Sequence, residues 1–348
     1  MGATSYLTKR ALALFLTVVI ATYLTIVIVN IGGYIDEIKK SQLYDELSQM
    51  VKRDPRYRML TPEEQDRIIK QMYELEVKRQ GLDQPFLIKS FIYLKDAITL
   101  NLGRSLYITS NTGSNDVKLI ILERLPATVL LFTTLTIINF IIHTTLGLYL
   151  SRRRGSLFDK VVVSLAPTSV IPGWLYGIVL ILIFASYLKI LPYGGMVDVP
   201  PPEDPFSYAL SVLKHMILPM LSWIVAGFFM GIYGSRTFFL LFSSEDYVIM
   251  GKAKGIPEKD LLYRYIFRPT LPPIITGLAL GLIGSWGGAI ITETVFSWPG
   301  LGRLTYEAIS AMDAPVIIAT TIVYAYLLAA TVLILDILYS YLDPRIRV

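Results

Sequence analysis

The chain alternates between long apolar stretches and shorter polar ones. Six stretches contain no Asp, Glu, Lys or Arg, and each reaches the length of about 20 residues with which a helix crosses the hydrocarbon core of a bilayer. The fourth continues through Arg236 to about Phe242. The pattern predicts an all-α integral membrane protein with six transmembrane helices, at 11–31, 125–150, 161–188, 216–235, 269–292 and 314–335.

One sizeable polar segment, residues 32–124, separates the first two spans. Within it, Thr61 is a favourable N-cap before Pro62, and Gly81 is a favourable stop, so a helix is expected between them. Its expected apolar stripe is Ile68, Met72 and Leu75, and residues 86–98 predict a second amphipathic helix. The segment reads as an extracytoplasmic cap on the spans, as a docking surface, or as both.

The flanking charges predict the orientation of the spans. Lys and Arg residues near transmembrane helices gather on the cytoplasmic side. With the N-terminus inside, fourteen of them face the cytoplasm, among them Arg345 and Arg347, whereas the short outer loops hold only Lys189, Lys214 and Arg303. Both termini are therefore expected in the cytoplasm, and the first span is expected to be retained, because it is longer than the apolar core of a signal peptide.

This organisation predicts three regions. Residues 1–31 form the cytoplasmic N-terminus and first span, residues 32–124 form a helical extracytoplasmic segment, and residues 125–348 form a five-helix core. The core carries a cytoplasmic loop at 243–271.

Composition supports the membrane class and removes several kinds of chemistry. The chain is 53% hydrophobic and 17% charged, with a mean hydropathy of +0.55. It has no cysteine and only two histidines, His143 and His215, which excludes disulfides and makes a Cys/His metal site untenable. No phosphate-binding G-x-x-x-x-G-K-[ST] motif or protease motif occurs, so we expect no ATP hydrolysis or other catalysis by this chain.

Prolines, glycines and ionisable groups within the spans are candidates for a pathway or gate. Pro167, Pro172 and Gly173 are expected to interrupt the third span and Pro219 the fourth. Broken helices are tolerated where they line a cavity or lie inside protein. Close helix packing explains the same residues equally well, and His143 reads as a neutral ring bonded to a neighbouring helix. The pathway or gate candidates are Pro172, Pro219, Gly284, Gly288 and Glu293.

The most charged stretch between two spans is "SSEDYVIMGKAKGIPEKDLLYRYIFRPTLPP" at 243–273. Ser243 or Ser244 is expected to cap a first helix, Gly255 to end it and Pro257 to begin a second. The second helix places Leu261, Leu262, Tyr265 and Ile266 on one face. An apolar ridge with a charged rim is typical of a docking surface, and a solvated loop is the alternative.

Several motifs in order resemble the membrane subunits of dipeptide/oligopeptide ABC importers. They include "NLGRSL" (101–106), "ERLPATVLL" (123–131), "RRGSLFD" (153–159), "EDYVIMGKAKGIPEKDLLYRYIFRPTLPPII" (245–275) and "ETVFSWPGLGRL" (293–304). In that family the cytoplasmic helix–turn–helix, named the EAA motif, fits a groove on a separate ATPase subunit. The resemblance implies coupling by Glu245, Asp246, Lys252, Ala253, Lys254, Gly255, Pro257, Leu261, Leu262 and Arg264. Where Glu-Ala-Ala would fall, this chain has Ile249, Met250 and Gly251.

The resemblance also implies partners, namely a second homologous permease, two ATP-binding subunits that carry ATP and magnesium, and an extracytoplasmic substrate-binding protein. No cofactor is expected on this chain, and no nucleic acid is expected as a partner. The location would be a prokaryotic cell membrane and the cargo peptides, oligosaccharides or nickel. A secondary transporter or channel driven by an ion gradient is the alternative function.

Overall fold

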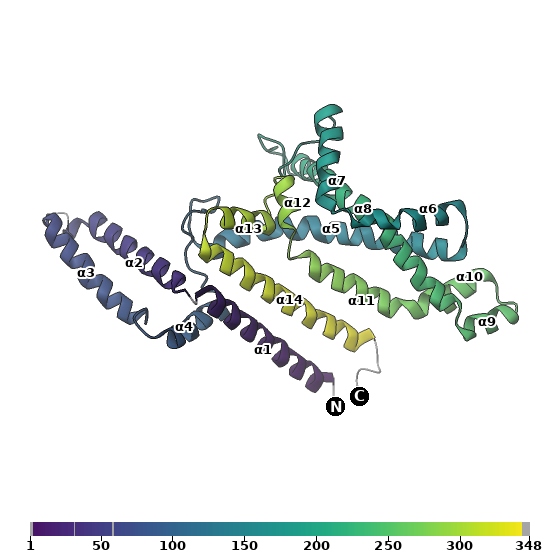
Figure 1. The fold of residues 1–348 in the computed structure, drawn as a ribbon, viewed down its shortest axis with the longest axis horizontal. Helices are drawn as coiled ribbons and strands as arrows, with labels where there is room; N and C mark the ends of the chain where they lie inside the picture. Colours follow the sequence, from purple (N-terminus) through teal and green to yellow (C-terminus); the bar gives the residue numbers. More distant parts are fainter. Residues whose placement is uncertain (1–2, 31, 58, 343–348) are drawn as a thin grey trace. The chain divides into compact units, whose positions relative to one another are not determined.

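The computed structural model describes residues 3–30, 32–57 and 59–342 (Figure 1). Within these ranges the chain is helical, and the β pairing is confined to an isolated bridge between Arg104 and Asp116. The predicted all-α membrane fold is therefore confirmed. The C-terminal Arg345 and Arg347, which enter the predicted count of inside charges, lie outside the described residues.

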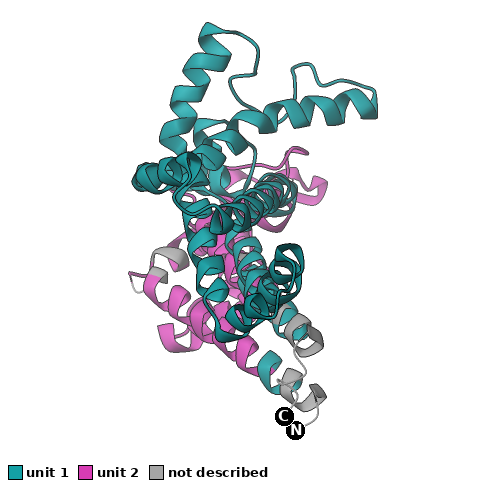
Figure 2. Cartoon of the chain, turned by 90° about the vertical axis from the view of Figure 1, so that its right-hand side faces the viewer, with its two compact units in different colours: residues 1–11, 121–310, 327–348 teal, residues 12–120, 311–326 magenta. Residues whose placement is uncertain are grey.

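The chain forms two units, coloured separately in Figure 2. Unit 1 comprises Met1–Ala11, Ile121–Ser310 and Leu327–Val348, and unit 2 comprises Leu12–Ile120 and Ala311–Tyr326. The long helices α1 (Ala3–Asn30) and α14 (Ala314–Leu342) contribute to both. The predicted outer segment 32–124 therefore folds mostly within unit 2, which also includes parts of two spans.

Unit 2 is built on three polar-faced helices around a small apolar core. They are α2 (Tyr34–Arg53), α3 (Pro62–Arg79) and α4 (Phe86–Ile98), with a 3₁₀ turn, η1 (Pro55–Tyr57), between the first two. The core collects Ile26 of α1, Leu43, Leu47, Leu82, Tyr93, Ala97 and Ile322 of α14. Burial of these side chains holds α2, α3 and α4 to the parts of α1 and α14 that lie in the same unit.

Helix α3 starts and stops where the sequence predicts. Thr61 and Glu64 form a reciprocal capping box, and Gly81, at φ +67°, follows the last turn. The predicted apolar stripe is confirmed at Met72, which packs against the core of unit 2, and is wrong at Leu75, which is exposed; the buried isoleucine is Ile69 instead of Ile68. Ile68 and Ile69 are adjacent, so the sequence pattern alone left the register ambiguous.

Asp313, just before α14, joins two distant parts of unit 2. Its carboxylate is fully buried and accepts from Ser105 Oγ at 2.6 Å and from the backbone N–H groups of Leu106 and Tyr107 at 3.0 Å each. The "NLGRSL" segment is thus tied to the start of the last span, and the carboxylate lies at the positive end of that helix.

Unit 1 holds the remaining helices. They are α5 (Val117–Arg152), α6 (Leu157–Leu165), η2 (Ala166–Val170), α7 (Gly173–Leu180), η3 (Ile181–Tyr187), α8 (Pro205–Ser243), α9 (Asp246–Ala253), α10 (Glu258–Asp260), η4 (Leu261–Phe267), α11 (Arg268–Ser285), α12 (Ile290–Val295) and α13 (Leu301–Ser310). The first four residues of α5 belong to unit 2.

The described residues contain four helices long and apolar enough to cross a membrane. These are Thr8–Ile28 in α1, all of α5, all of α8 and Ala314–Ile334 in α14. The pair Leu157–Val170 and Gly173–Tyr187 makes a fifth if it counts as one span, although it bends by 97°. By length and composition, the described residues therefore contain four or five candidate membrane spans, fewer than the six predicted.

Two predicted spans are broken at proline or glycine. In the third, the chain turns between Val170 and Gly173 because Pro172, the N-cap of α7, has no N–H to continue the preceding helix. In the fifth, α11 ends at Ser285, and Gly288 takes a φ of +69° before α12. Pro219 behaves differently: it lies inside α8, which continues past it, so the predicted interruption of the fourth span is wrong.

Candidate functional site

The cytoplasmic loop predicted for coupling begins with a short helix, α9. Neither predicted serine caps it, because Ser243 Oγ donates to the carbonyl of Phe239 and Ser244 Oγ to that of Leu241, both in α8. Glu245 occupies the N-cap position and makes no side-chain cap bond. Asp246 stands in the first turn, where its negative charge suits the helix dipole.

The turn after α9 depends on Gly255. Its φ of +75° is left-handed, and its N–H donates to the carbonyl of Lys252 at 3.0 Å. The N–H of Ile256 donates to the carbonyl of Gly251 at 3.2 Å. These two bonds form a Schellman motif, in which glycine is favoured because it has no Cβ. The predicted stop of the first helix at Gly255 is confirmed.

The second half of the loop packs inward. Pro257 is the N-cap of the one-turn α10, and η4 follows as a π-helix. The wider turn of a π-helix places Leu261 and Ile266, five residues apart, on one side. Both are buried in a core that also contains Phe239 and Val248. The predicted apolar ridge is therefore mostly internal, and Leu261 supports the loop from within.

The exposed apolar surface lies on α9 instead. Ile249 is 54% and Met250 is 58% exposed, and Tyr247 and Tyr263 are exposed nearby. Partial burial of its ring, and then the Glu245 carboxylate, raise the pKa of Tyr247. Gly251 is buried, and a Cβ there would lie 2.8 Å from a methyl group of Leu261. At the three positions where Glu-Ala-Ala would fall, the chain thus presents two exposed apolar side chains and one internal contact.

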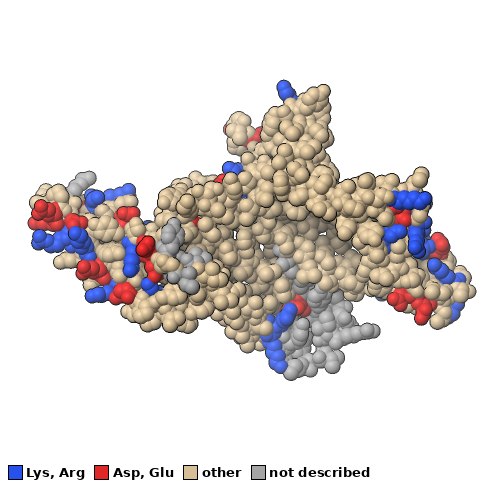
Figure 3. Space-filling view, viewed as in Figure 1, with Lys and Arg blue, Asp and Glu red and all other residues tan. Residues whose placement is uncertain are grey.

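Charged residues surround this apolar surface. Lys252, Lys254, Glu258, Lys259 and Arg264 are all exposed. Figure 3 shows Lys, Arg, Asp and Glu gathered at the end of unit 1 that holds α9, α10 and the turn between α5 and α6. The predicted charged residues are exposed as expected; of the two apolar residues in the same prediction, Ala253 is exposed and Leu262 is partly buried.

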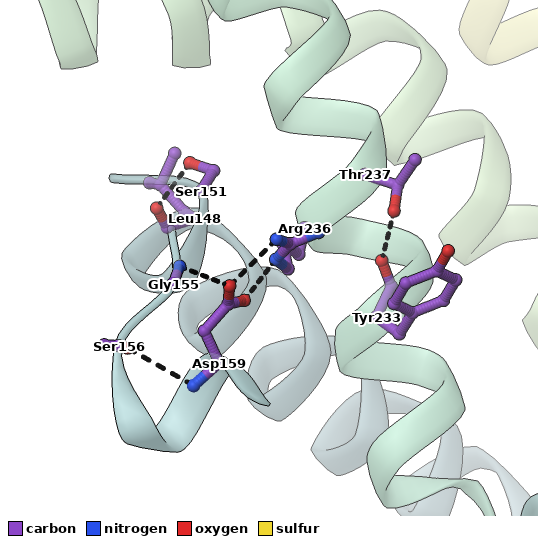
Figure 4. A network of polar contacts seen from close by, with 8 residues as sticks. All are labelled: Leu148, Ser151, Gly155, Ser156, Asp159, Tyr233, Arg236 and Thr237. Carbon is purple, nitrogen blue, oxygen red and sulfur yellow. Dashed lines mark hydrogen bonds and ion pairs between the residues drawn. The ribbon is translucent and has the colours of Figure 1, made fainter. Parts of the chain in front are cut away.

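Charged contacts at the end of α5 and in the adjoining "RRGSLFD" segment (153–159) reach α8 and the loop 243–271. Arg152 pairs with Glu258 at 2.8 Å. Asp159 forms a bidentate, buried ion pair with Arg236 of α8, with Nη2 2.9 Å from Oδ2 (Figure 4). The same carboxylate accepts from the backbone N–H of Gly155 at 2.8 Å. Charged contacts therefore connect the end of α5 to α10, and α6 to α8.

A second cluster joins "ETVFSWPGLGRL" to "ERLPATVLL". The Glu293 carboxylate is fully buried, accepts from Thr128 Oγ at 2.9 Å, and accepts from the backbone N–H of Arg303 at 3.0 Å. Thr128 Oγ in turn accepts from the N–H of Leu301 at 2.7 Å, and Trp298 Nε1 donates to the carbonyl of Ala127 at 2.9 Å. The two motifs form one buried hydrogen-bonded cluster.

Of the five pathway candidates, Gly288 and Glu293 lie against each other. Pro172 lies exposed at the bend before α7, Pro219 is buried in α8, and Gly284 lies exposed near the end of α11. Gly288 lies against Glu293, where a Cβ would meet Oε1 at 2.8 Å. The enclosed Glu293 is a structural acceptor in this arrangement, and the cavity that unit 1 does contain is lined by other residues.

Sequence reasoning missed Thr128 and Asp159, although both belong to motifs that it singled out. Among the described residues, no group of three or more His, Asp or Glu side chains is placed to hold a metal ion.

Comparison with known proteins identifies the class. Residues 143–348 match the family described as "binding-protein-dependent transport system inner membrane component". The dipeptide transport system permease protein DppB of Lactococcus lactis subsp. cremoris is 29% identical over 289 residues, covering 83% of this chain and 87% of the relative. The probable D,D-dipeptide transport system permease protein DdpB of Escherichia coli is 30% identical over 322 residues, covering 86% and 90%.

A third relative, the oligopeptide transport system permease protein AppB of Bacillus subtilis, is 29% identical over 272 residues, covering 78% of this chain and 84% of the relative. The apolar helices and these matches define a multi-pass membrane permease of the ABC importer class. The chain belongs to the binding-protein-dependent transport system inner membrane component family. The predicted resemblance to peptide importer permeases is confirmed.

Proposed function

We propose that the chain forms half of the translocation pathway of a peptide importer and is driven by separate ATPase subunits. The substrate class follows the three relatives described above, whose names specify dipeptides or oligopeptides. This favours peptides over the oligosaccharide and nickel alternatives. The other partners would be a second homologous permease and an extracytoplasmic substrate-binding protein, with ATP and magnesium held by the ATPase subunits.

The observation that carries the coupling proposal is the exposed apolar surface of α9 inside a charged rim. Exposed side chains such as Ile249 and Met250 lose contact with water when a partner covers them, whereas Leu261 and Ile266 already lie inside the chain. The apolar core around Val248, Leu261 and Ile266 fixes α9 to η4 and also contacts α11. A displacement of α9 by a partner would therefore move α11 as well. We place the ATPase contact on Tyr247, Ile249, Met250 and the surrounding charges.

The absence of cysteine allows a clean test by single-cysteine cross-linking. We expect Met250→Cys, in the assembled transporter, to cross-link to an ATPase subunit through a short bifunctional reagent. Met59→Cys is the matched control, since Met59 is 98% exposed and belongs to the segment proposed to lie outside. Cross-linking of the Met59→Cys variant but not of the Met250→Cys variant to the ATPase would contradict the proposal.

The same two variants test the orientation. An impermeant maleimide added to intact cells should label the Met59→Cys variant and spare the Met250→Cys variant until the membrane is opened. The reverse pattern would place α9 outside and remove it from reach of a cytoplasmic ATPase.

A further inference from the structure

A cavity of about 450 Å³ lies between α5, α8 and α11 in unit 1. None of its lining side chains is charged. Its polar wall comes mainly from α5, where Thr136, Asn139 and His143 follow one another at helical spacing and therefore share a face. Ser235 of α8 adds a hydroxyl from the opposite side. The cavity is thus polar along one side and lies within apolar spans.

Two polar atoms of this wall have no partner. Asn139 Oδ1 and His143 Nε2 are buried and form no hydrogen bond with any of the described residues. Thr136 differs, because its hydroxyl donates to the carbonyl of Phe132 in its own helix at 2.7 Å. A buried polar atom without a partner is costly, and such groups inside membrane spans commonly mark a substrate route.

Small residues on the two facing helices keep the cavity open. A Cβ at Gly231 would lie 2.2 Å from His143 Cε1, so the imidazole ring packs directly on the backbone of α8. A Cβ at Gly234 or at Gly277 would meet no atom within 4 Å. Glycine at 231 therefore positions the histidine, whereas glycines at 234 and 277 leave room for a ligand.

The chemistry of the wall indicates what it binds. Asn139 Oδ1 accepts a hydrogen bond, so the ligand must offer an N–H or O–H, and a peptide amide offers an N–H. His143 Nε2 donates or accepts according to its tautomer. The wall offers no charge to pair with a ligand ion, while Phe140, Phe238 and Leu278 offer apolar contact. The volume falls in the range of small-molecule sites, roughly 300–1,000 Å³.

We propose that this cavity binds the backbone amide groups of a peptide in transit, with Asn139 and His143 as its hydrogen-bonding residues. The inference rests on the proposed function as a peptide permease. Every peptide carries backbone amides, so a site that recognises them would accept peptides with different side chains. Those side chains would contact the aromatic and aliphatic part of the wall.

The test is uptake of radiolabelled tri-alanine by the complete transporter in proteoliposomes, with its second permease, ATPase subunits and binding protein. Asn139→Leu should lower the kcat/KM of uptake about tenfold, the effect of one hydrogen bond. Gly277→Val should also lower it, because the valine side chain fills space that Gly277 leaves open. Thr145→Val is the matched control on α5, because Thr145 is exposed and its hydroxyl bonds only within its own helix. All three variants should assemble like the wild type, and Thr145→Val should also keep the wild-type uptake and ATPase rate.

Tri-alanine N-methylated at its central amide lacks the N–H that Asn139 would accept. The Asn139→Leu penalty should therefore be much smaller for this peptide than for tri-alanine, and discrimination by the binding protein cancels in that comparison. The inference would be overturned if Asn139→Leu lowered the uptake of the two peptides equally. It would also be overturned if assembled Asn139→Leu and Gly277→Val transporters took up tri-alanine like the wild type, because the cavity would then hold water alone. Absence of tri-alanine uptake by the wild-type transporter would overturn the proposed function and the inference with it.

Discussion

Replacement of Glu293 tests whether the buried cluster between "ETVFSWPGLGRL" and "ERLPATVLL" holds unit 1 together. In Glu293→Ala, the hydroxyl of Thr128 and the N–H of Arg303 both lose their acceptor in a site that water does not reach. Each orphaned buried donor costs about 1–3 kcal/mol. The variant should therefore lose about 2–6 kcal/mol of stability, before any contribution from the empty space left by the side chain.

Glu293→Gln provides the intermediate case. The amide keeps the volume and one acceptor oxygen, but its NH₂ group replaces the second acceptor. In either orientation of the amide, the Thr128 hydroxyl or the N–H of Arg303 faces the NH₂ group, so one donor remains unsatisfied and a loss of about 1–3 kcal/mol is expected. Glu307→Ala is the matched control in α13, because its pair with Arg303 at 2.8 Å is partly exposed and contributes about 0–1 kcal/mol.

The assay is thermal or denaturant unfolding of the purified protein in detergent, followed by tryptophan fluorescence. Trp298 is fully buried and bonded to Ala127 within the same cluster, so its emission reports on this region. The expected order of stability is wild type, Glu307→Ala, Glu293→Gln and Glu293→Ala. If Glu293→Ala were as stable as Glu307→Ala, the structural role assigned to the carboxylate would be refuted.

Three further predictions concern other contacts. Asp159→Ala leaves Arg236 buried without its partner and should cost about 3–5 kcal/mol in the same unfolding assay, whereas Thr237→Val on the exposed side of α8 should change little; equal effects would contradict the buried ion pair. Gly255→Val should cost about 1–2 kcal/mol locally, seen as faster amide exchange in α9, and Gly255→Asn should restore most of the protection; slow exchange in the valine variant would refute the turn assignment. Asp313→Ala deprives Ser105 Oγ and two backbone N–H groups of their acceptor and should cost about 3 kcal/mol or more, measured by proteolysis within residues 101–116, with exposed Asp83→Ala as the control; unchanged proteolysis would contradict the account.

Much of this architecture was predictable because long apolar runs and capping residues act locally. The helix after Thr61 and the turn at Gly255 follow from side chains and φ angles within a few residues. The register of α3 and the internal position of Leu261 were not predictable, because both depend on which neighbour covers the helix.

The site was predictable only in outline. The loop 243–271 stood out by its charge, but the exposure of Ile249 and Met250 depends on the Gly251–Leu261 contact, which no periodicity indicates. Glu293 was singled out as an ionisable group near a span end, and its enclosure depends on Thr128, 165 residues away in the chain. The break of the third span was predictable from Pro172 and Gly173, whereas the end of α11 at Ser285 within the fifth predicted span was not, because hydropathy does not register a bend.

The most direct test of the central claim is the energy source for transport. The complete transporter in proteoliposomes should take up tri-alanine only when ATP reaches the ATPase subunits and the binding protein is on the opposite side. Ionophores that dissipate proton and sodium gradients should leave that uptake unchanged. Gradient-driven uptake by this chain without ATPase subunits would contradict the account and would identify a secondary transporter instead.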